Sequence, residues 1–386
     1  MQHPMSAGGP IASRTSERIT DASALEALAP AWDALAGISP GAHVFQSYPW
    51  LATWLRHRPD GAPAVLIARR GAQLTAALPL CAHDVGWGPF RLRTLRFAAE
   101  DADFADALWD PEHPEDLAAL WIELLSSRDW HLIDLRNVPE DAYLTTLAQA
   151  AAGPLQVQVQ RMDAEPYLDI TVDWRESVPK SQRPKLLRRR RQLQDKGTVA
   201  FDVADSSAEV DTMLGQFAAL HVARWQARGE TSVFRFATYR AWLRDLCRDL
   251  LRRGQLYLCR LALNDDPVGM GLYFLSGRRL VNHLFAFSEA YKQYGPVHLL
   301  VMAVIEDARS RGLADVHDFG RGDEEYKLRW TRQAQGLDRL LIARPSLPGL
   351  AAFRWSATAK PWLWRHSRLH AVARELRRRW ALHRAA

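Results

Sequence analysis

A strongly basic segment near the middle of the chain separates two halves of similar make-up. Between Arg175 and Lys196, nine residues are lysine or arginine and two are acidic. Each flanking half mixes amphipathic helix patterns with short alternating strands. A chain of 386 residues exceeds what one ordinary hydrophobic core organises. We therefore expect two α+β domains, each with a mixed, mostly antiparallel sheet flanked by helices.

Changes in composition set the expected limits of these parts. Residues 1–18 are polar and rich in glycine and proline, so we expect them to be disordered. The first domain is assigned to residues 19–173 and the second to residues 174–346. Residues 347–386 are expected to form a basic helical tail that is rich in tryptophan and arginine.

The net charge of +6 is concentrated in that tail. From Arg354 onward there are nine basic residues and one acidic residue, which leaves the preceding residues with a net charge of −2. This distribution argues against a nucleic-acid-binding body, and we expect no DNA partner. The apolar stripe among the tail arginines has two interpretations: peripheral binding to an anionic membrane surface, or packing against the body.

Cysteine and histidine usage indicates the compartment and the absence of a metal. Cys81, Cys247 and Cys259 lie far apart in apolar segments, which is typical of reduced, buried thiols in a cytoplasmic protein. The first 20 residues hold no apolar signal segment, and no uncharged apolar run is long enough to span a membrane. No histidine spacing matches a metal-binding motif, so no metal is expected.

The segment from Leu256 to Phe319 has the pattern of three strands, a loop, a helix and a further strand. The loop ends at Gly295, and a helix follows directly. Free backbone N–H groups at such a helix start bind anions, although a Gly-Pro before a helix is more often a plain turn. The candidate residues for binding the phosphates of an acyl donor are Lys292, Tyr294, Gly295, Val297 and His298.

The densest group of reactive residues follows the last of these strands, in the sequence HDFGRGDEEYKLRWT. A solvated helix start explains its run of acids. That explanation does not account for Asp318 at the end of an apolar strand, or for Tyr326 and Lys327 before a face expected to be buried. The candidate catalytic residues are therefore Asp318, Glu324, Tyr326 and Lys327.

A second candidate group lies on a long predicted helix. His221, Arg224 and Trp225 either pack in the core beside a solvated arginine or form a wall that binds an anionic or sugar acceptor. Arg321 is assigned to the same substrate-binding group. His283 alternates with apolar residues, which favours a sheet histidine with satisfied hydrogen bonds over a catalytic one.

These motifs resemble the CelD/BcsL-type acetyltransferases of the GNAT superfamily. The resemblance rests on four elements: F-x-S-x-x-W-L-x-x-W starting at Phe45, the arginine-rich helix, H-x-x-R-W starting at His221, and D-F-x-x-G-D-E-x-Y-K-x-x-W starting at Asp318. It spans about residues 44–344. The chain is also similar to the Fem-type peptidoglycan aminoacyltransferases, which pair two GNAT-like domains.

The resemblance implies transfer of an acetyl group from acetyl-CoA to an amine or hydroxyl of a sugar or polysaccharide precursor, in cellulose or exopolysaccharide synthesis. The usual pyrophosphate loop, Q/R-x-x-G-x-G/A, is present only as QYGPVH with one glycine missing, which leaves another activated acyl donor open. Two alternatives remain. One is a Fem-like enzyme that uses aminoacyl-tRNA, and the other is a non-catalytic partner in a polysaccharide-synthesis assembly.

Acyl transfer needs a base, donors to an oxyanion and a proton or cation for the leaving thiolate. Asp318 or Glu324 is the expected base. Backbone N–H groups on a splayed strand edge are the expected oxyanion donors. Tyr326 and Lys327 are assigned to the leaving group. Four consecutive arginines, Arg188–Arg191, circle their helix, which suits either solvation or contact with a phosphate-bearing substrate or tRNA.

Overall fold

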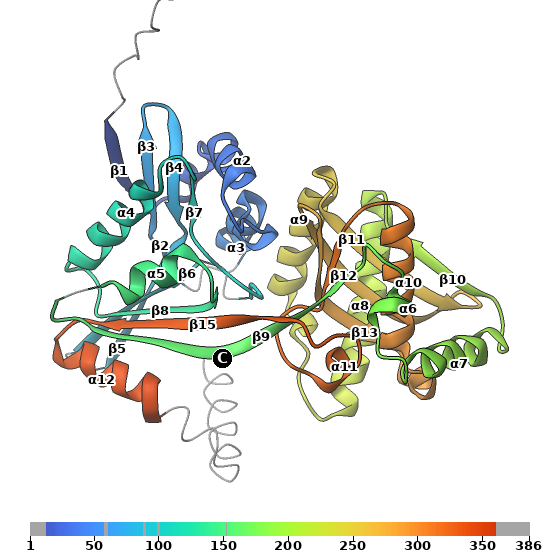
Figure 1. The fold of residues 1–386 in the computed structure, drawn as a ribbon. Coiled ribbons are helices and arrows are strands. Elements are labelled where there is room, and N and C mark those ends of the chain that lie inside the picture. Colours follow the sequence, from blue (N-terminus) through green and yellow to red (C-terminus); the bar gives the residue numbers. More distant parts are fainter. Residues whose placement is uncertain (1–12, 58–60, 88–89, 99–100, 152, 360–386) are drawn as a thin grey trace, which may run out of the picture.

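The computed structural model describes residues 13–57, 61–87, 90–98, 101–151 and 153–359. Two lobes lie side by side, and one sheet runs through both of them (Figure 1). Its eleven strands have the order β10-β11-β12-β13-β14-β9-β15-β8-β6-β5-β2. A separate four-stranded sheet, β1-β3-β4-β7, belongs to the first lobe.

The first lobe is built from short helices around these two sheets. Its helices are α1 (Ala22–Glu26), α2 (Ala29–Ile38), η1 (Val44–Gln46), α3 (Tyr48–His57), α4 (Pro114–Ser126) and α5 (Tyr143–Gln149). Its strands are β1 (Arg14–Ile19), β2 (Ala62–Pro63), β3 (Val65–Arg70), β4 (Gln73–Leu78), β5 (Leu80–Trp87), β6 (Phe90–Phe97), β7 (Leu108–Trp109) and β8 (Leu132–Pro139). The helical segment is broken between α1 and α2, and Pro30 lies in the first turn of α2, where a missing N–H is tolerated.

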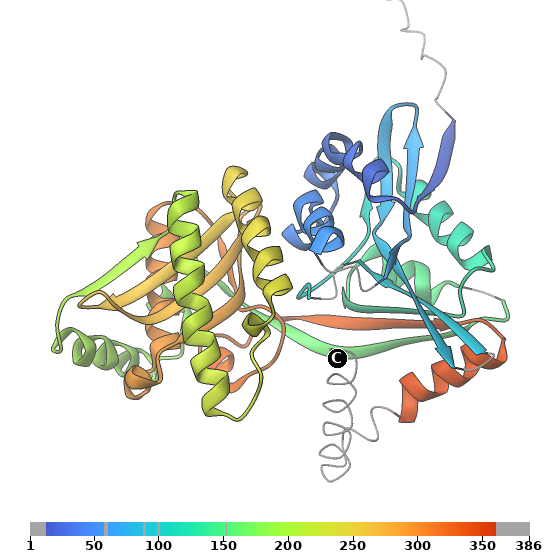
Figure 2. The ribbon, with the colours of Figure 1, turned by 180° about the vertical axis from the view of Figure 1, so that it is seen from behind.

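The second lobe is a strand meander covered by helices on both faces. Its helices are α6 (Trp174–Ser177), α7 (Arg183–Gln194), α8 (Ser207–Ala227), η2 (Val233–Arg235), α9 (Ala237–Arg252), η3 (Glu289–Tyr294), α10 (Pro296–Ser310) and α11 (Glu325–Leu328). Its strands are β10 (Val199–Val203), β11 (Leu256–Leu263), β12 (Asp266–Ser276), β13 (Arg279–Phe287) and β14 (Val316–Asp318). Successive residues of β11 point to opposite faces of the sheet. Leu258 belongs to the core under α8 and α9, which lie in front of the sheet in Figure 2, and Cys259 belongs to the core under α10.

Two long strands join the lobes. β9 (Gln156–Asp169) pairs with β15 (Ala334–Ala343) in the first lobe, and its last three residues pair with β14 in the second. β15 also pairs with β8. This differs from the expectation that residues 174–346 form a domain with its own last strand, because β15 lies in the sheet of the first lobe. Arg339 of β15 makes two hydrogen bonds to the buried carboxylate of Asp134 in β8, at 2.6 and 2.9 Å.

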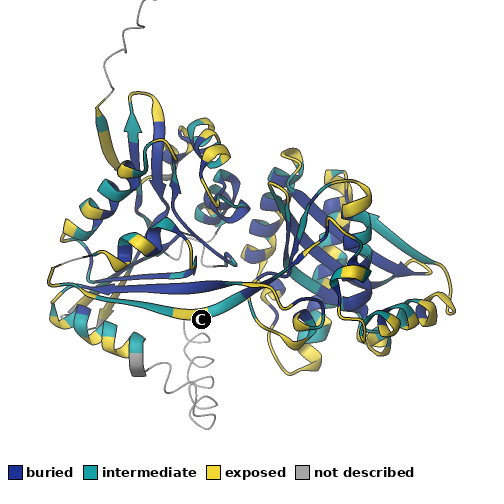
Figure 3. Cartoon of the chain, viewed as in Figure 1, coloured by how far each residue is buried: buried dark blue, intermediate teal, exposed yellow. Residues whose placement is uncertain are grey.

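An aromatic cluster holds the lobes together. Trp50 and Trp54 of α3 contact the ring of Trp242 in α9, with centroid separations of 5.4 and 5.5 Å. Phe45 contacts Phe274 of β12 at 6.3 Å. The F-x-S-x-x-W-L-x-x-W motif therefore forms the packing between the lobes. Figure 3 shows that buried residues follow the central strands of both lobes, while exposed residues lie on the outer helices.

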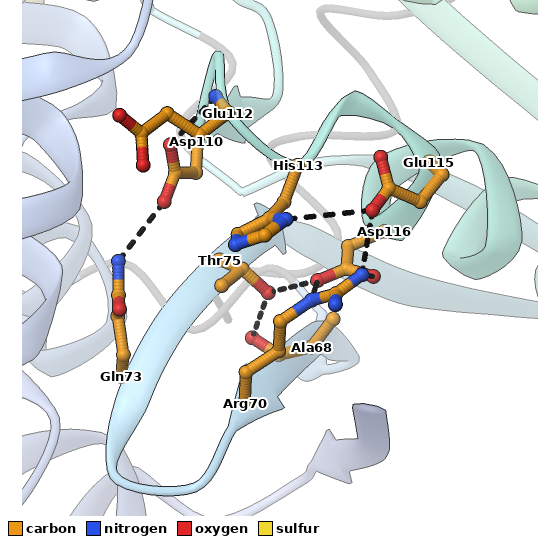
Figure 4. Close-up of polar contacts among 9 residues, drawn as sticks. All are labelled: Ala68, Arg70, Gln73, Thr75, Asp110, Glu112, His113, Glu115 and Asp116. Carbon is orange, nitrogen blue, oxygen red and sulfur yellow. Dashed lines mark hydrogen bonds and ion pairs between the residues drawn. The ribbon is translucent and has the colours of Figure 1, made fainter. Parts of the chain in front are cut away.

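A polar network fixes α4 to the β3–β4 hairpin (Figure 4). Arg70 donates two hydrogen bonds to Asp116 at 2.8 and 3.0 Å, and Thr75 donates a third at 2.6 Å. Burial raises the pKa of Asp116, but these hydrogen bonds outweigh burial and the net pKa is lowered. The network anchors the first lobe and lies outside the site described below.

Two expectations differ from the structure or lie beyond it. Residues 14–18 of the expected disordered segment belong to β1, which pairs with β3. The tail begins as expected with α12 (Leu347–Arg354) and the helical turn η4 (Trp355–Ala359), and the whole of the proposed membrane-binding stripe lies outside the described residues. None of the helices in the described ranges is both long and apolar enough to cross a membrane.

Candidate active site

The central feature of the second lobe is a pair of strands that separate. β13 and β14 are parallel and pair only from Arg279 to Val281 of β13. The β14-facing edge of β13 beyond Val281 pairs with no strand among the described residues. The register with β12 shifts at the same place and leaves His283 as an extra residue. An open strand edge of this kind offers free backbone N–H groups to an oxyanion.

The loop after β14 is held by Lys327, which is 2% exposed. Its ammonium donates to the carbonyl oxygens of Gly320, Arg321 and Gly322 at 2.9, 2.7 and 3.2 Å. It also pairs with the carboxylate of Glu324 at 2.8 Å, and the Glu324 side chain is 59% exposed. Lys327 therefore points inward as predicted, but its protons are engaged by the loop that it holds in place.

Asp318 belongs to a buried group of charges at the end of β14. The Arg279 guanidinium donates to Asp318 Oδ2 at 2.5 Å, and the Gly320 N–H donates to Asp318 Oδ1 at 2.8 Å. The carboxyl of Glu165, from β9, is in hydrogen-bonding contact with Asp318. Burial and the neighbouring charge of Asp318 raise the pKa of Glu165 well above its ordinary value. Burial also raises the pKa of Asp318, although Arg279 counteracts it.

Tyr326 lies beside the open edge of β13. Its ring contacts Phe285 of β13 and His298 of α10, with centroid separations of 6.1 and 6.4 Å. Burial, and next the carboxylate of Glu324, raise the pKa of Tyr326, so its phenol stays protonated. Arg224 of α8 reaches the same region, because its guanidinium lies 4.2 Å from the ring centroid of Phe287.

A histidine–carboxylate pair at the open edge was missed by sequence reasoning. His283 Nδ1 lies 2.9 Å from Asp103 Oδ2, and Asp103 comes from the loop before β7 in the first lobe. His283 Nε2 is buried and has no hydrogen-bond partner in the part of the chain that the structure describes. The expectation of a satisfied sheet histidine therefore holds for one ring nitrogen only. The available signal was the placement of acids among apolar residues in the segment DADFADALW.

The start of α10 faces a basic cavity of about 340 Å³. Gly295 caps α10 with a φ of +66°, and the Arg189 guanidinium lies so close that a Cβ on Gly295 would approach it to 2.8 Å. Lys185 and Arg329 line the same cavity, together with Glu325, which pairs with Arg329 at 2.6 Å. Basic side chains thus gather at the positive end of a helix, an arrangement that suits a phosphate.

The five residues predicted to bind donor phosphates separate into two groups. His298 lines the basic cavity and Gly295 lies beside Arg189, which lines it too; burial and the nearby arginines lower the pKa of His298 to about 4. Lys292 is exposed and pairs with Glu289 at 3.2 Å. Tyr294 and Val297 are half-buried and do not line the cavity. Sequence reasoning offered Arg189, within Arg188–Arg191, for contact with a phosphate-bearing substrate. It did not place Lys185, Arg189 and Arg329 together beside the start of α10, because they are distant from it in the chain.

The four residues predicted to bind the substrate, His221, Arg224, Trp225 and Arg321, do not lie together. His221 is buried, stacks on Trp225 and lies 2.8 Å from the Ser232 hydroxyl, so these two aromatic residues pack in the core of the lobe. Burial lowers the pKa of His221 to about 4. Arg224 alone reaches the open edge of β13. The Arg321 side chain is exposed.

A cavity of about 500 Å³ lies between the lobes, next to these groups. The loop that carries Asp103 also supplies Phe104 and Asp106 to its wall, while Glu165 and Arg279 form the side that faces Asp318. No group of three or more histidine, cysteine, aspartate or glutamate residues in the described ranges could hold a metal ion.

Comparison with known proteins identifies the fold. Residues 180–328 match the family model described as an acetyltransferase (GNAT) domain. A search of curated proteins found no match. The structure is similar to FemX, with a TM-score of 0.56 and 14% identity over 84% of this chain and 96% of that chain. It is also similar to a conserved protein of unknown function from Bacteroides thetaiotaomicron, with a TM-score of 0.53 and 12% identity over 82% and 97%, and to L-PGS from Bacillus licheniformis, with a TM-score of 0.50 and 12% identity over 84% and 95%.

These comparisons establish a GNAT domain in the second lobe, within a mixed α+β fold of the GNAT-like kind. The expected fold class is thereby confirmed. The separating strands β13 and β14, Tyr326 and most of α10's surroundings all fall inside the matched region. The comparisons do not distinguish the CelD/BcsL type from other members of the superfamily.

Proposed function

We propose that the chain is an acyltransferase that moves an acetyl group from acetyl-CoA to an amine or hydroxyl of a sugar or polysaccharide precursor. The observation that carries this proposal is the open edge of β13, with Tyr326 on one side and His283 beside it, inside a GNAT domain. The basic cavity at the start of α10 supports the same assignment, because its cations compensate for the glycine that the phosphate loop lacks.

The donor enters from the α10 side in this proposal. Lys185, Arg189 and Arg329 bind its phosphate groups, together with the backbone N–H groups of the first turn of α10. The acyl carbonyl comes to the open edge of β13, where free N–H groups stabilise the oxyanion.

His283 is the base in this proposal. Sequence reasoning assigned that role to Asp318 or Glu324, but both are held in ion pairs, with Arg279 and Lys327. Nδ1 of His283 donates to Asp103, which leaves Nε2 free to accept a proton from the attacking amine or hydroxyl. The new C–N or C–O bond forms, the C–S bond breaks, and Tyr326 gives its proton to the leaving thiolate. The proton on His283 returns to Tyr326 through solvent.

The proposed cellular setting is cellulose or exopolysaccharide synthesis, in the cytoplasm or at the inner membrane face. It is supported by the motif resemblance described above. The tail residues that suggest membrane contact lie outside the described ranges.

The similarity to FemX favours a second candidate function. A Fem-like enzyme takes its acyl group from aminoacyl-tRNA, and α7 offers a surface for RNA phosphates. Arg188 and Arg191 of α7 are exposed, whereas Arg190 pairs with Glu306 at 3.1 Å. Binding of aminoacyl-tRNA that weakens steeply with salt would support this candidate over the first.

Thermal stability in the presence of acetyl-CoA tests the donor. At about 100 times the dissociation constant, a ligand adds about 2.7 kcal/mol to the free energy of unfolding. Transfer is then followed by release of free CoA thiol with a panel of sugar and amino-sugar acceptors. The absence of a shift with any acyl-CoA would refute the donor assignment and favour aminoacyl-tRNA or a non-catalytic partner.

Two substitutions test the chemistry. His283→Gln and Tyr326→Phe should each lower kcat about 100-fold or more, because each removes a proton-transfer group. Lys292→Ala is the matched control and should leave kcat and KM unchanged, because Lys292 is exposed and does not line the basic cavity. Wild-type rates in both variants would refute the assignment of the base and the acid.

A further inference from the structure

The cavity between the lobes is lined by three carboxyl groups, of which those of Asp106 and Glu165 are buried and that of Asp141 is exposed. Asp106, Asp141 and Glu165 line it, and Arg279 is the basic residue among the lining residues apart from the imidazole of His43. Arg279 is already neutralised, because it pairs with Asp318 at 2.5 Å. The wall facing the cavity is therefore acidic.

Neither of the two buried carboxyls forms an ion pair among the described residues, although Arg279, which Asp318 neutralises, lies near Glu165. Asp106 is 7% exposed and accepts a hydrogen bond from the Ala107 N–H at 2.7 Å. Glu165 is 1% exposed, and its Oε1 atom has no hydrogen-bond partner among the described residues. By contrast, Asp141 receives a hydrogen bond from Gln335 at 2.7 Å. A buried carboxylate without a cation is costly, so burial favours the protonated form of both groups until a cation arrives.

The pKa values of the titratable groups that line the cavity agree with that argument. Burial raises the pKa of Asp106 to about 7 and raises that of Glu165 well above its ordinary value. Burial and the charge of Arg279 hold the pKa of His43 well below its ordinary value, so this imidazole is neutral and does not supply the missing cation. A bound ammonium group would draw a proton off the carboxyl wall, and binding near neutral pH would release it.

Aromatic side chains complete the cavity. The rings of Trp109 and Tyr143 contact each other at 5.1 Å and line it together with Phe104. Aromatic rings beside acidic groups favour binding of a polar molecule about the size of a sugar ring that carries a cationic group. Phe104 also follows Asp103 directly in sequence, so the loop that orients His283 forms part of the cavity wall.

We propose that this cavity is the acceptor site and that it selects a primary amine on a sugar-sized ring, an amino sugar, by placing the ammonium against Asp106 and Glu165. This inference rests on the proposed acyltransferase function and specifies its acceptor class. A neutral sugar leaves the two carboxyls without a cation and binds weakly. An anionic acceptor is repelled by the same wall.

Binding of matched sugar pairs to the full chain tests the proposal. Isothermal titration calorimetry at pH 7.0, without donor, compares glucosamine with glucose and galactosamine with galactose. In at least one pair the amino sugar should bind tenfold or more tightly than its hydroxyl analogue. Repeating the titration in buffers of different ionisation enthalpy should reveal release of protons on binding.

Substitutions of the wall supply the second test. Asp106→Asn and Glu165→Gln should each weaken binding of the preferred amino sugar about tenfold and leave the hydroxyl analogue unaffected. Glu112→Gln, an exposed acid of the same lobe that does not line the cavity, is the control and should bind as the wild type does. Comparison of the sugar pairs on the wild-type chain needs no variant to fold.

Equal binding of amino sugar and hydroxyl analogue, no binding of any of the four sugars, or wild-type affinity in both variants would overturn the proposal. Acetyl-CoA binding measured on the same samples separates this failure from failure of the proposed function. If acetyl-CoA still binds, the acceptor assignment alone is wrong. If acetyl-CoA also fails to bind, the proposed function falls with it.

Discussion

Replacing Lys327 with methionine would separate the structural role of this residue from a chemical one. The substitution keeps the length of the side chain and its packing, and removes the ammonium. Three carbonyl oxygens then lose their donor: that of Gly320, which is buried, and those of Arg321 and Gly322, which are partly buried.

The expected loss of stability follows from those contacts. One buried, unsatisfied carbonyl costs about 1–3 kcal/mol, and each partly buried hydrogen bond contributes about 0.5–1 kcal/mol because water replaces the lost donor only in part. The ion pair with Glu324 adds little, because Glu324 is 59% exposed. The free energy of unfolding should therefore fall by about 3 kcal/mol in Lys327→Met.

Urea unfolding with linear extrapolation measures this loss. Lys292→Met is the matched control, since its side chain is 69% exposed and should change the free energy of unfolding by less than about 0.5 kcal/mol. A loss below about 1 kcal/mol in Lys327→Met would refute the argument that Lys327 holds the loop after β14. Its role in catalysis would then have to be chemical, as the sequence suggested.

Three further outcomes follow from the structure. Gly320→Ala should lower the free energy of unfolding by about 2 kcal/mol or more, because a Cβ would lie 2.4 Å from the carbonyl oxygen of Asn282 at a φ of +68°; a variant as stable to urea as the wild type would contradict this. The pKa of Asp134 is lowered to about 2, since hydrogen bonds from Arg339 outweigh burial. Above pH 4 the pair should add about 2 kcal/mol to the free energy of unfolding, and this contribution should be lost as the pH falls toward 2. Urea unfolding of Asp134→Asn should lack this pH dependence. The pKa of His221 is lowered to about 4, so the unfolded chain binds a proton at a higher pH than the folded chain does. The free energy of unfolding should therefore fall as the pH is lowered from 6.5 to 4. The fall should be smaller in His221→Gln, and an equal fall in the variant and the wild type would refute the assignment.

The sequence determined the elements whose signals are local. Short apolar runs bounded by turn residues predicted the strands β11, β12 and β13. The Asn264-Asp265 turn between the first two has the positive φ values, 49° and 68°, that such a hairpin turn needs. The proline and glycine at the start of α10 placed that helix correctly. The expectation that Tyr326 and Lys327 turn inward also depended on local pattern, because these two residues directly precede a face that was expected to be buried.

Only the tertiary structure decided how distant segments combine. β15 crosses to the first lobe because β9 offers it a long edge, and nothing in either strand's own pattern specifies that partner. Asp103 reaches His283 across 180 residues, and Glu165 meets Asp318 through the pairing of β9 with β14. Periodicity reports which face of an element is buried, but not what it is buried against. The candidate base, the basic cavity and the acidic wall therefore emerged only from the packing of the two lobes.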